Sequence, residues 1–282
     1  MRLSTISHQG RTTWGVIEGE HFLDTGVVLA SRYRDLKAAI AAGLAGVAEA
    51  AGQAAALPLA ELQWLPVIPN PDKILCIGLN YETHRKETGR TEVEHPTIFA
   101  RYANSQTGHL APIVRPRVSV DLDFEGELAV IIGKPGRYIP RAEAMGHIAG
   151  YACYNDASVR DFQRHTHQFT PGKNFMDTGA FGPWLMTPDE LGPLPALRLQ
   201  TRLNGQVVQE ALLGQMIFDI ARQIEYCSTF TRLEAGDVIV SGTPGGVGAK
   251  RNPPLWMKPG DWVEVEVERL GVLRNPVTAE AD

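Results

Sequence analysis

Residues 121–132 read Asp121-Leu122-Asp123-Phe124-Glu125-Gly126-Glu127-Leu128-Ala129-Val130-Ile131-Ile132. Alternate side chains of a β-strand share one face, so this spacing predicts that Asp123, Glu125 and Glu127 point the same way. The apolar run that follows predicts a strand entering the core, where neighbouring carboxylates repel one another and are costly to desolvate. A bound cation removes both costs, and an all-oxygen donor set favours Mg²⁺, Mn²⁺ or Ca²⁺ over zinc. The alternative is a solvated turn with exposed acids, which are common on protein surfaces.

A further acidic position stands at the end of another predicted strand. The stretch Tyr151-Ala152-Cys153-Tyr154-Asn155-Asp156 is rich in apolar side chains and ends in a carboxylate. A carboxylate at the end of a strand makes Asp156 a candidate third metal ligand. The alternative is that Asp156 caps the amino terminus of a helix that follows it, which is a common role for aspartate.

A histidine and a glutamate follow the strand predicted over residues 73–78. His84 and Glu87 are three positions apart in Gly78-Leu79-Asn80-Tyr81-Glu82-Thr83-His84-Arg85-Lys86-Glu87, so they meet on one face of a short helix. A carboxylate beside an imidazole orients the ring and raises its basicity, as a general base requires. The alternative is a surface ion pair without a catalytic role.

Basic side chains near residue 170 are candidates for binding substrate or metal. Lys173 lies between a glycine and an apolar patch in Thr170-Pro171-Gly172-Lys173-Asn174-Phe175. A lysine beside a metal would hold a substrate carboxylate or an enolate oxygen, whereas an ordinary surface lysine is the alternative. His165 and His167 have the spacing of a zinc pair, but no third soft ligand stands at a suitable distance, so no zinc site is predicted.

A glycine-rich segment, Ser241-Gly242-Thr243-Pro244-Gly245-Gly246-Val247-Gly248, follows the strand predicted over residues 237–241. Pro244 and the lack of a following helix exclude a dinucleotide-binding fingerprint, and the lack of a final Lys-Ser or Lys-Thr pair excludes a phosphate-binding P-loop. The backbone N–H groups, including that of Gly242, and the Thr243 hydroxyl are predicted to hold a substrate carboxylate. A simple tight turn is the alternative.

A proline-rich stretch, Leu65-Pro66-Val67-Ile68-Pro69-Asn70-Pro71, divides the chain. Proline favours extended backbone and ends helices, so this stretch is predicted to join a small α/β domain, residues 1–68, to a larger domain, residues 69–282. The small domain is predicted to contain a β-hairpin near Trp14 and an alanine-rich helix over 38–57, broken by glycines. The larger domain is predicted to be α+β and predominantly β, with strands over 73–78, 127–132, 148–155, 197–203, 237–241 and 262–268 and a helix over 215–230.

The composition of the chain limits which binding partners and which cellular location we expect for the protein. The 282 residues carry a formal net charge of -5 and a pI of about 5.9, without a basic stretch, which argues against a nucleic-acid partner. The three cysteines form no CxxC pair, so reduced thiols and a cytoplasmic location are expected. No leader peptide or membrane span is expected, because the amino terminus lacks an apolar run and residues 38–57 are mostly alanine and glycine.

Taken together, these segments resemble the fumarylacetoacetate hydrolase (FAH) family in its short-chain bacterial form, over residues 73–277. The resemblance implies a mixed β-roll preceded by a small amino-terminal domain, and usually a homodimer. It implies Mg²⁺ or Mn²⁺, sometimes Ca²⁺, held by Glu125, Glu127 and Asp156. It also implies a His84–Glu87 dyad on a lid that orders when ligand binds, with Lys173 as the family lysine. Family substrates are 2-oxo acids or 1,3-diketones that chelate the metal.

The sequence departs from the family pattern beside the predicted site. Where the family has a lysine followed by prolines and a serine, this chain has Phe99-Ala100-Arg101-Tyr102-Ala103-Asn104-Ser105. The Arg101 guanidinium is predicted to bind a second acidic end of the substrate, because its planar fork matches a carboxylate. Asn174 replaces the serine that usually follows the family lysine.

The resulting hypothesis is a metal-dependent hydrolase that cleaves a C–C bond of an acylpyruvate-like 2,4-dioxo acid. His84, oriented by Glu87, would activate a water, and the metal with Lys173 would stabilise the enolate that leaves. Alternatives on the same metal site are oxaloacetate decarboxylation and isomerase or hydratase steps on 2-oxo acids. An alternative from another class is a non-catalytic metal- or ligand-binding module with the same fold.

Overall fold

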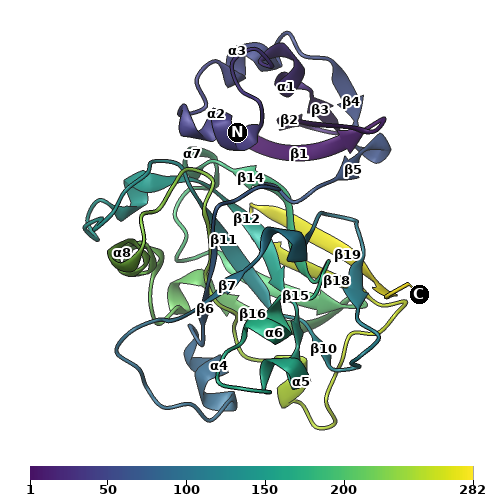
Figure 1. The fold of residues 1–282 in the computed structure, drawn as a ribbon, viewed down its shortest axis with the longest axis vertical. Helices are drawn as coiled ribbons and strands as arrows, with labels where there is room; N and C mark the ends of the chain where they lie inside the picture. Colours follow the sequence, from purple (N-terminus) through teal and green to yellow (C-terminus); the bar gives the residue numbers. More distant parts are fainter. Residues whose placement is uncertain (282) are drawn as a thin grey trace.

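The computed structural model describes residues 1–281 and is dominated by β-sheet (Figure 1). Its strands form a twelve-stranded sheet, a five-stranded sheet and a two-stranded ladder, and the helices are short. The prediction of an α+β chain that is predominantly β is therefore confirmed. The large sheet runs in the order β4-β3-β2-β1-β14-β12-β11-β17-β6-β7, and the five-stranded sheet in the order β16-β15-β18-β19-β9.

The amino-terminal strands lie at one end of the molecule, with three short helices (Figure 1). The predicted hairpin is present, and the predicted alanine-rich helix is indeed broken, because Gly43 and Gly46 both adopt positive φ angles between its two halves. Strand β1 also pairs with β14, at Arg2 and Met186, so the amino-terminal strands extend the large sheet. The domain boundary after residue 68 stays a prediction. The elements are β1 (Arg2–His8), β2 (Arg11–Glu18), β3 (His21–Leu23), α1 (Thr25–Val28), α2 (Leu36–Ala41), α3 (Val47–Ala51), β4 (Ala56–Pro58) and β5 (Gln63–Trp64).

The strands predicted for the second part of the chain are all present, with ends that differ by at most one residue. They form the centre of the large sheet and two strands of the five-stranded sheet. The bounds are β6 (Ile74–Gly78), β11 (Gly126–Ile132), β12 (Ile148–Asp156), β15 (Arg198–Leu203), β17 (Val238–Val240) and β18 (Trp262–Val267). Further strands are β7 (Thr97–Arg101), β8 (Gln106–Thr107), β9 (Ile113–Arg115), β10 (Leu122–Asp123), β13 (Ser158–Val159), β14 (Gly179–Met186), β16 (Gln206–Leu212) and β19 (Gly271–Ala279).

Strand β11 is buried along its whole length and contributes to two hydrophobic clusters. Leu128 and Val130 belong to the cluster shared with the five-stranded sheet, whereas Ala129 and Ile131 belong to the cluster shared with the amino-terminal helices. Gly126 begins the strand where the two sheets approach each other: a Cβ there would lie 2.0 Å from the Thr201 hydroxyl oxygen. The glycine between the two glutamates therefore permits the close sheet packing that buries them.

The helix predicted over residues 215–230 is shorter than expected. Helix α8 spans Ile220–Phe230, and the Asp219 side chain caps it by accepting from the Arg222 N–H. The prediction was wrong for residues 215–219 because Asn80 binds this backbone instead: its carbonyl accepts from Ile217 and its side chain from Phe218. Of the apolar residues in this segment, Met216 packs against the large hydrophobic cluster, whereas Ile217 is exposed.

Three short helices gather at the end of the molecule away from the amino-terminal strands (Figure 1). They are α4 (Glu82–Glu87), α5 (Arg160–Gln163) and α6 (Thr170–Lys173), and helix α7 (Pro188–Leu191) lies elsewhere. Short 3₁₀ turns are η1 (Leu59–Glu61), η2 (Ala103–Ser105), η3 (Ala144–His147), η4 (Leu213–Gln215) and η5 (Gly248–Lys250). Within residues 1–281, no helix has the length and apolar character needed to cross a bilayer.

Candidate metal centre

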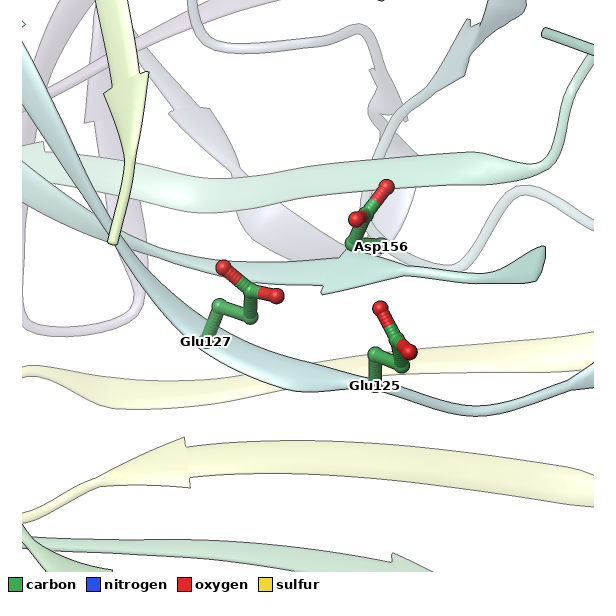
Figure 2. A group of neighbouring side chains, drawn as sticks. All are labelled: Glu125, Glu127 and Asp156. Atoms are coloured by element: carbon green, nitrogen blue, oxygen red, sulfur yellow. The ribbon is translucent and has the colours of Figure 1, made fainter. Parts of the chain in front are cut away.

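Three carboxylates converge where β11 begins and β12 ends (Figure 2). One oxygen from each of Glu125, Glu127 and Asp156 lies within 4.8 Å of the other two. The antiparallel pairing explains this, because Gly126 lies opposite Asn155 and the Asp156 N–H donates to the Glu125 carbonyl at 2.8 Å. The three residues are at most 4% exposed, so the charges lie in the protein interior.

Buried cations bind two of these carboxylates. The Lys173 ammonium bridges them, at 2.6 Å from Glu125 and 2.5 Å from Asp156. Arg160 lies 2.6 Å from the second oxygen of Glu125, and Arg101 lies 2.6 Å from the second oxygen of Asp156. Glu127 has no cationic partner among the described residues and accepts one backbone hydrogen bond, from the Gly242 N–H.

The pKa values follow this unequal pairing. Burial raises the pKa of Glu127 well above its ordinary value, and the neighbouring Asp156 and Glu125 carboxylates add to the effect. Burial alone would raise the pKa of Glu125 too, but Arg160 and Lys173 hold it below its ordinary value. The carboxylates raise the pKa of Lys173 in spite of its burial, so this side chain stays an ammonium ion. A metal ligand must be deprotonated, so a cation bound at this site would oppose the rise in the pKa of Glu127.

The donor set fits a hard divalent cation. Three converging carboxylates supply oxygen ligands, and Glu127 lacks the cationic partner that the other two have. With Glu127 ionised, the buried charges of the site leave one negative charge uncompensated, and a divalent ion would change this to one positive charge. These charges are Asp123, Glu125, Glu127 and Asp156 against Arg101, Arg160 and Lys173.

Asp123 does not join the three carboxylates, contrary to the expectation that it would share their face. Residues 124 and 125 lie between β10 and β11, outside any strand, so the alternation breaks there. The Asp123 carboxylate instead accepts hydrogen bonds from Arg160 at 2.8 Å and from the backbone N–H groups of Gly248 and Ala249 at 2.7 and 2.9 Å. It positions Arg160, whose other contact is Glu125.

The glycine-rich segment after β17 binds carboxylates of the protein itself. Gly242 donates to Glu127 and Gly246 donates to Glu87 at 2.9 Å, and Gly248 donates to Asp123. Gly242 has a φ of 103°, and a Cβ there would lie 2.5 Å from the Asn80 Cβ, so only glycine fits. The N–H groups expected to bind substrate are thus already occupied by the site's own acids.

The His84–Glu87 dyad is formed on helix α4. His84 Nδ1 lies 2.7 Å from one Glu87 oxygen, and the other oxygen accepts from Gly246. His84 is 6% exposed, so the pair is not an ordinary surface ion pair. The glycine-rich segment therefore fixes the glutamate, and the glutamate fixes the imidazole ring.

One cavity of about 770 Å³ unites these groups. A cavity of this size is typical of small-molecule sites. Thr243 also reaches its wall, with a hydroxyl that donates to the Gly126 carbonyl and accepts from Gln209. The walls include, from the predicted site, His84, Glu125, Glu127, Asp156, Lys173 and Thr243.

Arg101 does not line this cavity, contrary to the role predicted for it as a substrate ligand. Its side chain is fully buried behind Asp156, where it donates to the Ala157 carbonyl at 3.0 Å and to the Thr178 hydroxyl at 2.7 Å. The Arg101 side chain, at the end of β7, points into the protein, and its guanidinium holds Asp156 in place. Sequence reasoning placed the arginine beside the site but could not assign the face of the strand.

Arg101→Ala should destabilise the protein strongly, because it leaves the buried Asp156 carboxylate without one of its two cations. Breaking a buried ion pair on one side costs about 3–5 kcal/mol of unfolding free energy. Urea unfolding should show this as a lower midpoint with an unchanged slope. Arg34→Ala is the matched control, since Arg34 is 82% exposed and should change the midpoint little. Equal midpoints for the two variants would refute the supporting role of Arg101.

Arg160 is a functional residue whose role was not predicted from the sequence. It bridges Asp123 and Glu125, lines the cavity, and donates to Gln163 at 2.9 Å. The sequence places Arg160 four residues after Asp156, which does not by itself indicate that the two side chains share a site. The short strand β13, which lies between them in the chain, was not predicted. His165 and His167 also line the cavity, and the described residues contain no metal-capable group that includes them.

Comparison with known proteins places the fold and the site in a family. Residues 73–278 match the model of the fumarylacetoacetate (FAA) hydrolase C-terminal domain. The human mitochondrial oxaloacetate tautomerase FAHD2A is 41% identical over 229 residues, which cover 80% of this chain and 73% of that protein.

Two solved structures match nearly the whole chain. Fumarylacetoacetate hydrolase from Exiguobacterium antarcticum superposes with a TM-score of 0.86 at 32% identity and covers 99% of this chain and all of that one. Maleylpyruvate hydrolase from Sphingobium sp. SYK-6, in complex with manganese(II) and pyruvate, has a TM-score of 0.83 at 26% identity and full coverage of both chains. With the buried acidic triad at the expected place, the chain belongs to the fumarylacetoacetate hydrolase family.

Proposed function

We propose that this protein catalyses proton transfer at the carbon next to the keto group of a 2-oxo acid, and that its reaction is the keto–enol tautomerisation of an oxaloacetate-like acid. One observation carries the proposal: the buried His84, which is paired with Glu87, lines the same cavity as Lys173 and the three carboxylates. A proton-transfer group therefore shares a cavity with groups that stabilise negative charge on a substrate oxygen.

A divalent ion held by Glu125, Glu127 and Asp156 would supply Lewis-acid polarisation of the 2-oxo oxygen. Lys173, already an ammonium ion, adds positive charge beside the same carboxylates. Because His84 Nδ1 contacts Glu87, we assign the proton to Nδ1, which leaves Nε2 free to accept one. His84 takes the proton from C3, the electrons of that C–H bond move toward the 2-oxo oxygen, and the proton returns to this oxygen to yield the enol. The reverse sequence yields the keto acid.

Similarity supports this choice of reaction and metal. The human relative at 41% identity is an oxaloacetate tautomerase, and tautomerisation needs only the single proton transfer described above. The maleylpyruvate hydrolase structure holds manganese(II) with pyruvate, a 2-oxo acid. We therefore propose Mg²⁺ or Mn²⁺ as the ion, in line with the preference of carboxylate ligands.

Hydrolysis of a C–C bond in an acylpyruvate-like 2,4-dioxo acid is the second candidate. The volume of the cavity, about 770 Å³, favours it, because a four-carbon acid fills only a small part of that space. In this reaction His84 would deprotonate a water for attack on the distal carbonyl, and the leaving group would be the enolate that Lys173 stabilises.

An assay of both reactions with purified protein tests the proposal. Enolic oxaloacetate should lose its ultraviolet absorbance faster with protein and Mg²⁺ or Mn²⁺ than with protein and a chelator. In parallel, acylpyruvates should be tested for release of pyruvate, and oxaloacetate for release of carbon dioxide. Tight metal binding without acceleration of any of these reactions would contradict the proposal and favour a non-catalytic binding module.

A further inference from the structure

The backbone between the two glutamates of the metal centre lies beyond the end of a strand ladder. Strand β17 pairs with β11 over residues 129–131, and the Ser241 N–H then donates to the Leu128 carbonyl at 3.0 Å. Among residues 1–281, no strand pairs with the buried Gly126 on the side of β17. Its N–H and carbonyl therefore need other partners, because unpaired backbone groups are costly in a protein interior.

A buried glutamine and a threonine supply these partners. The Gly126 N–H donates to the Gln209 side-chain oxygen at 3.0 Å, and the Thr243 hydroxyl donates to the Gly126 carbonyl at 3.0 Å. The Gln209 amide also donates to the Thr243 hydroxyl at 2.9 Å, which closes a ring of three hydrogen bonds. Gln209 is 2% exposed and comes from β16 of the five-stranded sheet, so the ring joins the two sheets at the metal centre.

The surrounding contacts determine the direction of every hydrogen bond in this ring. The Gln209 amide nitrogen also donates to the Pro244 carbonyl at 2.9 Å. A rotated amide would place its nitrogen against the Gly126 N–H and its oxygen against the Pro244 carbonyl, so only one orientation fits. Since a carbonyl cannot donate, the hydroxyl proton of Thr243 goes to Gly126. Both protons of the amide and the single proton of the hydroxyl are therefore bound within the protein.

Gly126 links the two glutamates, and the ring holds the peptide unit on each side of it. The Gly126 N–H belongs to the peptide that joins it to Glu125, and the Gly126 carbonyl belongs to the peptide that joins it to Glu127. Glycine has the most freely rotating backbone of all residues. A hydrogen-bond partner for each peptide is therefore needed to keep the two glutamates in one relative orientation.

We propose that Gln209 is a positioning residue for the metal centre. Through the Gly126 backbone and the Thr243 hydroxyl, it fixes the separation of the Glu125 and Glu127 carboxylates and so the affinity of the site for a divalent ion. The proposal rests on the metal centre of the proposed function. Groups that hold metal ligands in place typically contribute about 10–100-fold to metal affinity, although they do not touch the ion.

Titration of the metal-free protein with Mn²⁺, without substrate, tests the proposal. Gln209→Met keeps the length of the side chain and removes the hydrogen bonds of the amide, so it should weaken Mn²⁺ binding about 10–100-fold. Thr243→Val removes the hydroxyl at constant shape and should weaken binding too, whereas Thr243→Ser keeps the hydroxyl and should bind Mn²⁺ normally. Because either change opens the same ring, the double variant Gln209→Met/Thr243→Val should bind about as weakly as the weaker single variant.

Gln223→Met is the matched control. Gln223 is also buried, its amide donates to the Phe218 carbonyl at 2.8 Å, and neither of these residues lines the cavity. This variant should lower the urea midpoint and leave the Mn²⁺ affinity within about twofold, because it is independent of the ring.

The pattern of affinities decides between a positioning and a merely structural role. An equal loss of Mn²⁺ affinity in Gln223→Met, or losses that simply add in the double variant, would overturn the proposal. If Gln209→Met does not fold, equal Mn²⁺ affinity of Thr243→Val and Thr243→Ser would overturn it. In each of these cases the metal centre of the proposed function would remain, whereas an unaltered protein that binds no Mn²⁺ would contradict both.

Discussion

Glu125→Ala should abolish both divalent-ion binding and turnover. Glu125 is one of only three converging carboxylates, and it also accepts Lys173 and Arg160. Changes to groups that merely support a ligand cost about 10–100-fold in metal affinity, so loss of a ligand should cost more than about 100-fold. kcat/KM should fall on the order of a thousandfold, because the charge that stabilises the enolate oxygen is lost. Mn²⁺ titration and the enol assay measure the two effects.

Two further variants make the Glu125 result interpretable. Glu20→Ala removes an exposed glutamate and should bind Mn²⁺ and turn over normally. Glu125→Gln keeps the shape of the side chain and removes the charge, so it separates loss of the ligand from a packing defect. A folded Glu125→Gln protein with unchanged metal content and rate would exclude the proposed centre.

His84→Ala should abolish turnover and leave metal binding intact. The imidazole lines the cavity but is not one of the three carboxylate ligands. Loss of a general base lowers kcat by about 10²–10⁴-fold, whereas Mn²⁺ affinity should change little. This split between rate and affinity distinguishes His84 from Glu125. His21→Ala, at an exposed position on β3, is the matched control and should keep the full rate.

Glu87→Gln separates the orienting role of the glutamate from the proton transfer itself. The amide can still contact His84 and Gly246, but it no longer stabilises a protonated ring. The rate should therefore fall, with a smaller loss than in His84→Ala. Full activity of His84→Ala would show that the dyad has no part in the reaction.

The local features of the site were predictable from the sequence. Glu125 and Glu127 flank a single glycine before an apolar run, and this pattern predicted two acids close together where the buried strand β11 begins. His84 and Glu87 meet because residues three apart on a helix are neighbours. Asp156 was a candidate ligand because it ends a predicted strand, but it is thirty-one positions from Glu125 and becomes its neighbour only through the β11–β12 register.

The predictions that were wrong concern residues whose positions depend on tertiary contacts. Asp123 leaves the common face because the chain departs from strand geometry at residues 124 and 125, and its partners come from a loop more than a hundred residues later. Arg101 turns inward at the end of β7, where periodicity does not specify the face.

The most direct measurement is a crystal structure of the protein with Mn²⁺ and oxalate, which resembles the 2-oxo acid end of a substrate. The account predicts an anomalous manganese peak in contact with an oxygen from each of Glu125, Glu127 and Asp156, and with one oxygen from each carboxylate of the oxalate. His84 should face the oxalate from the opposite wall of the cavity. A protein that binds no manganese there, or binds it through other residues, would contradict the central claim.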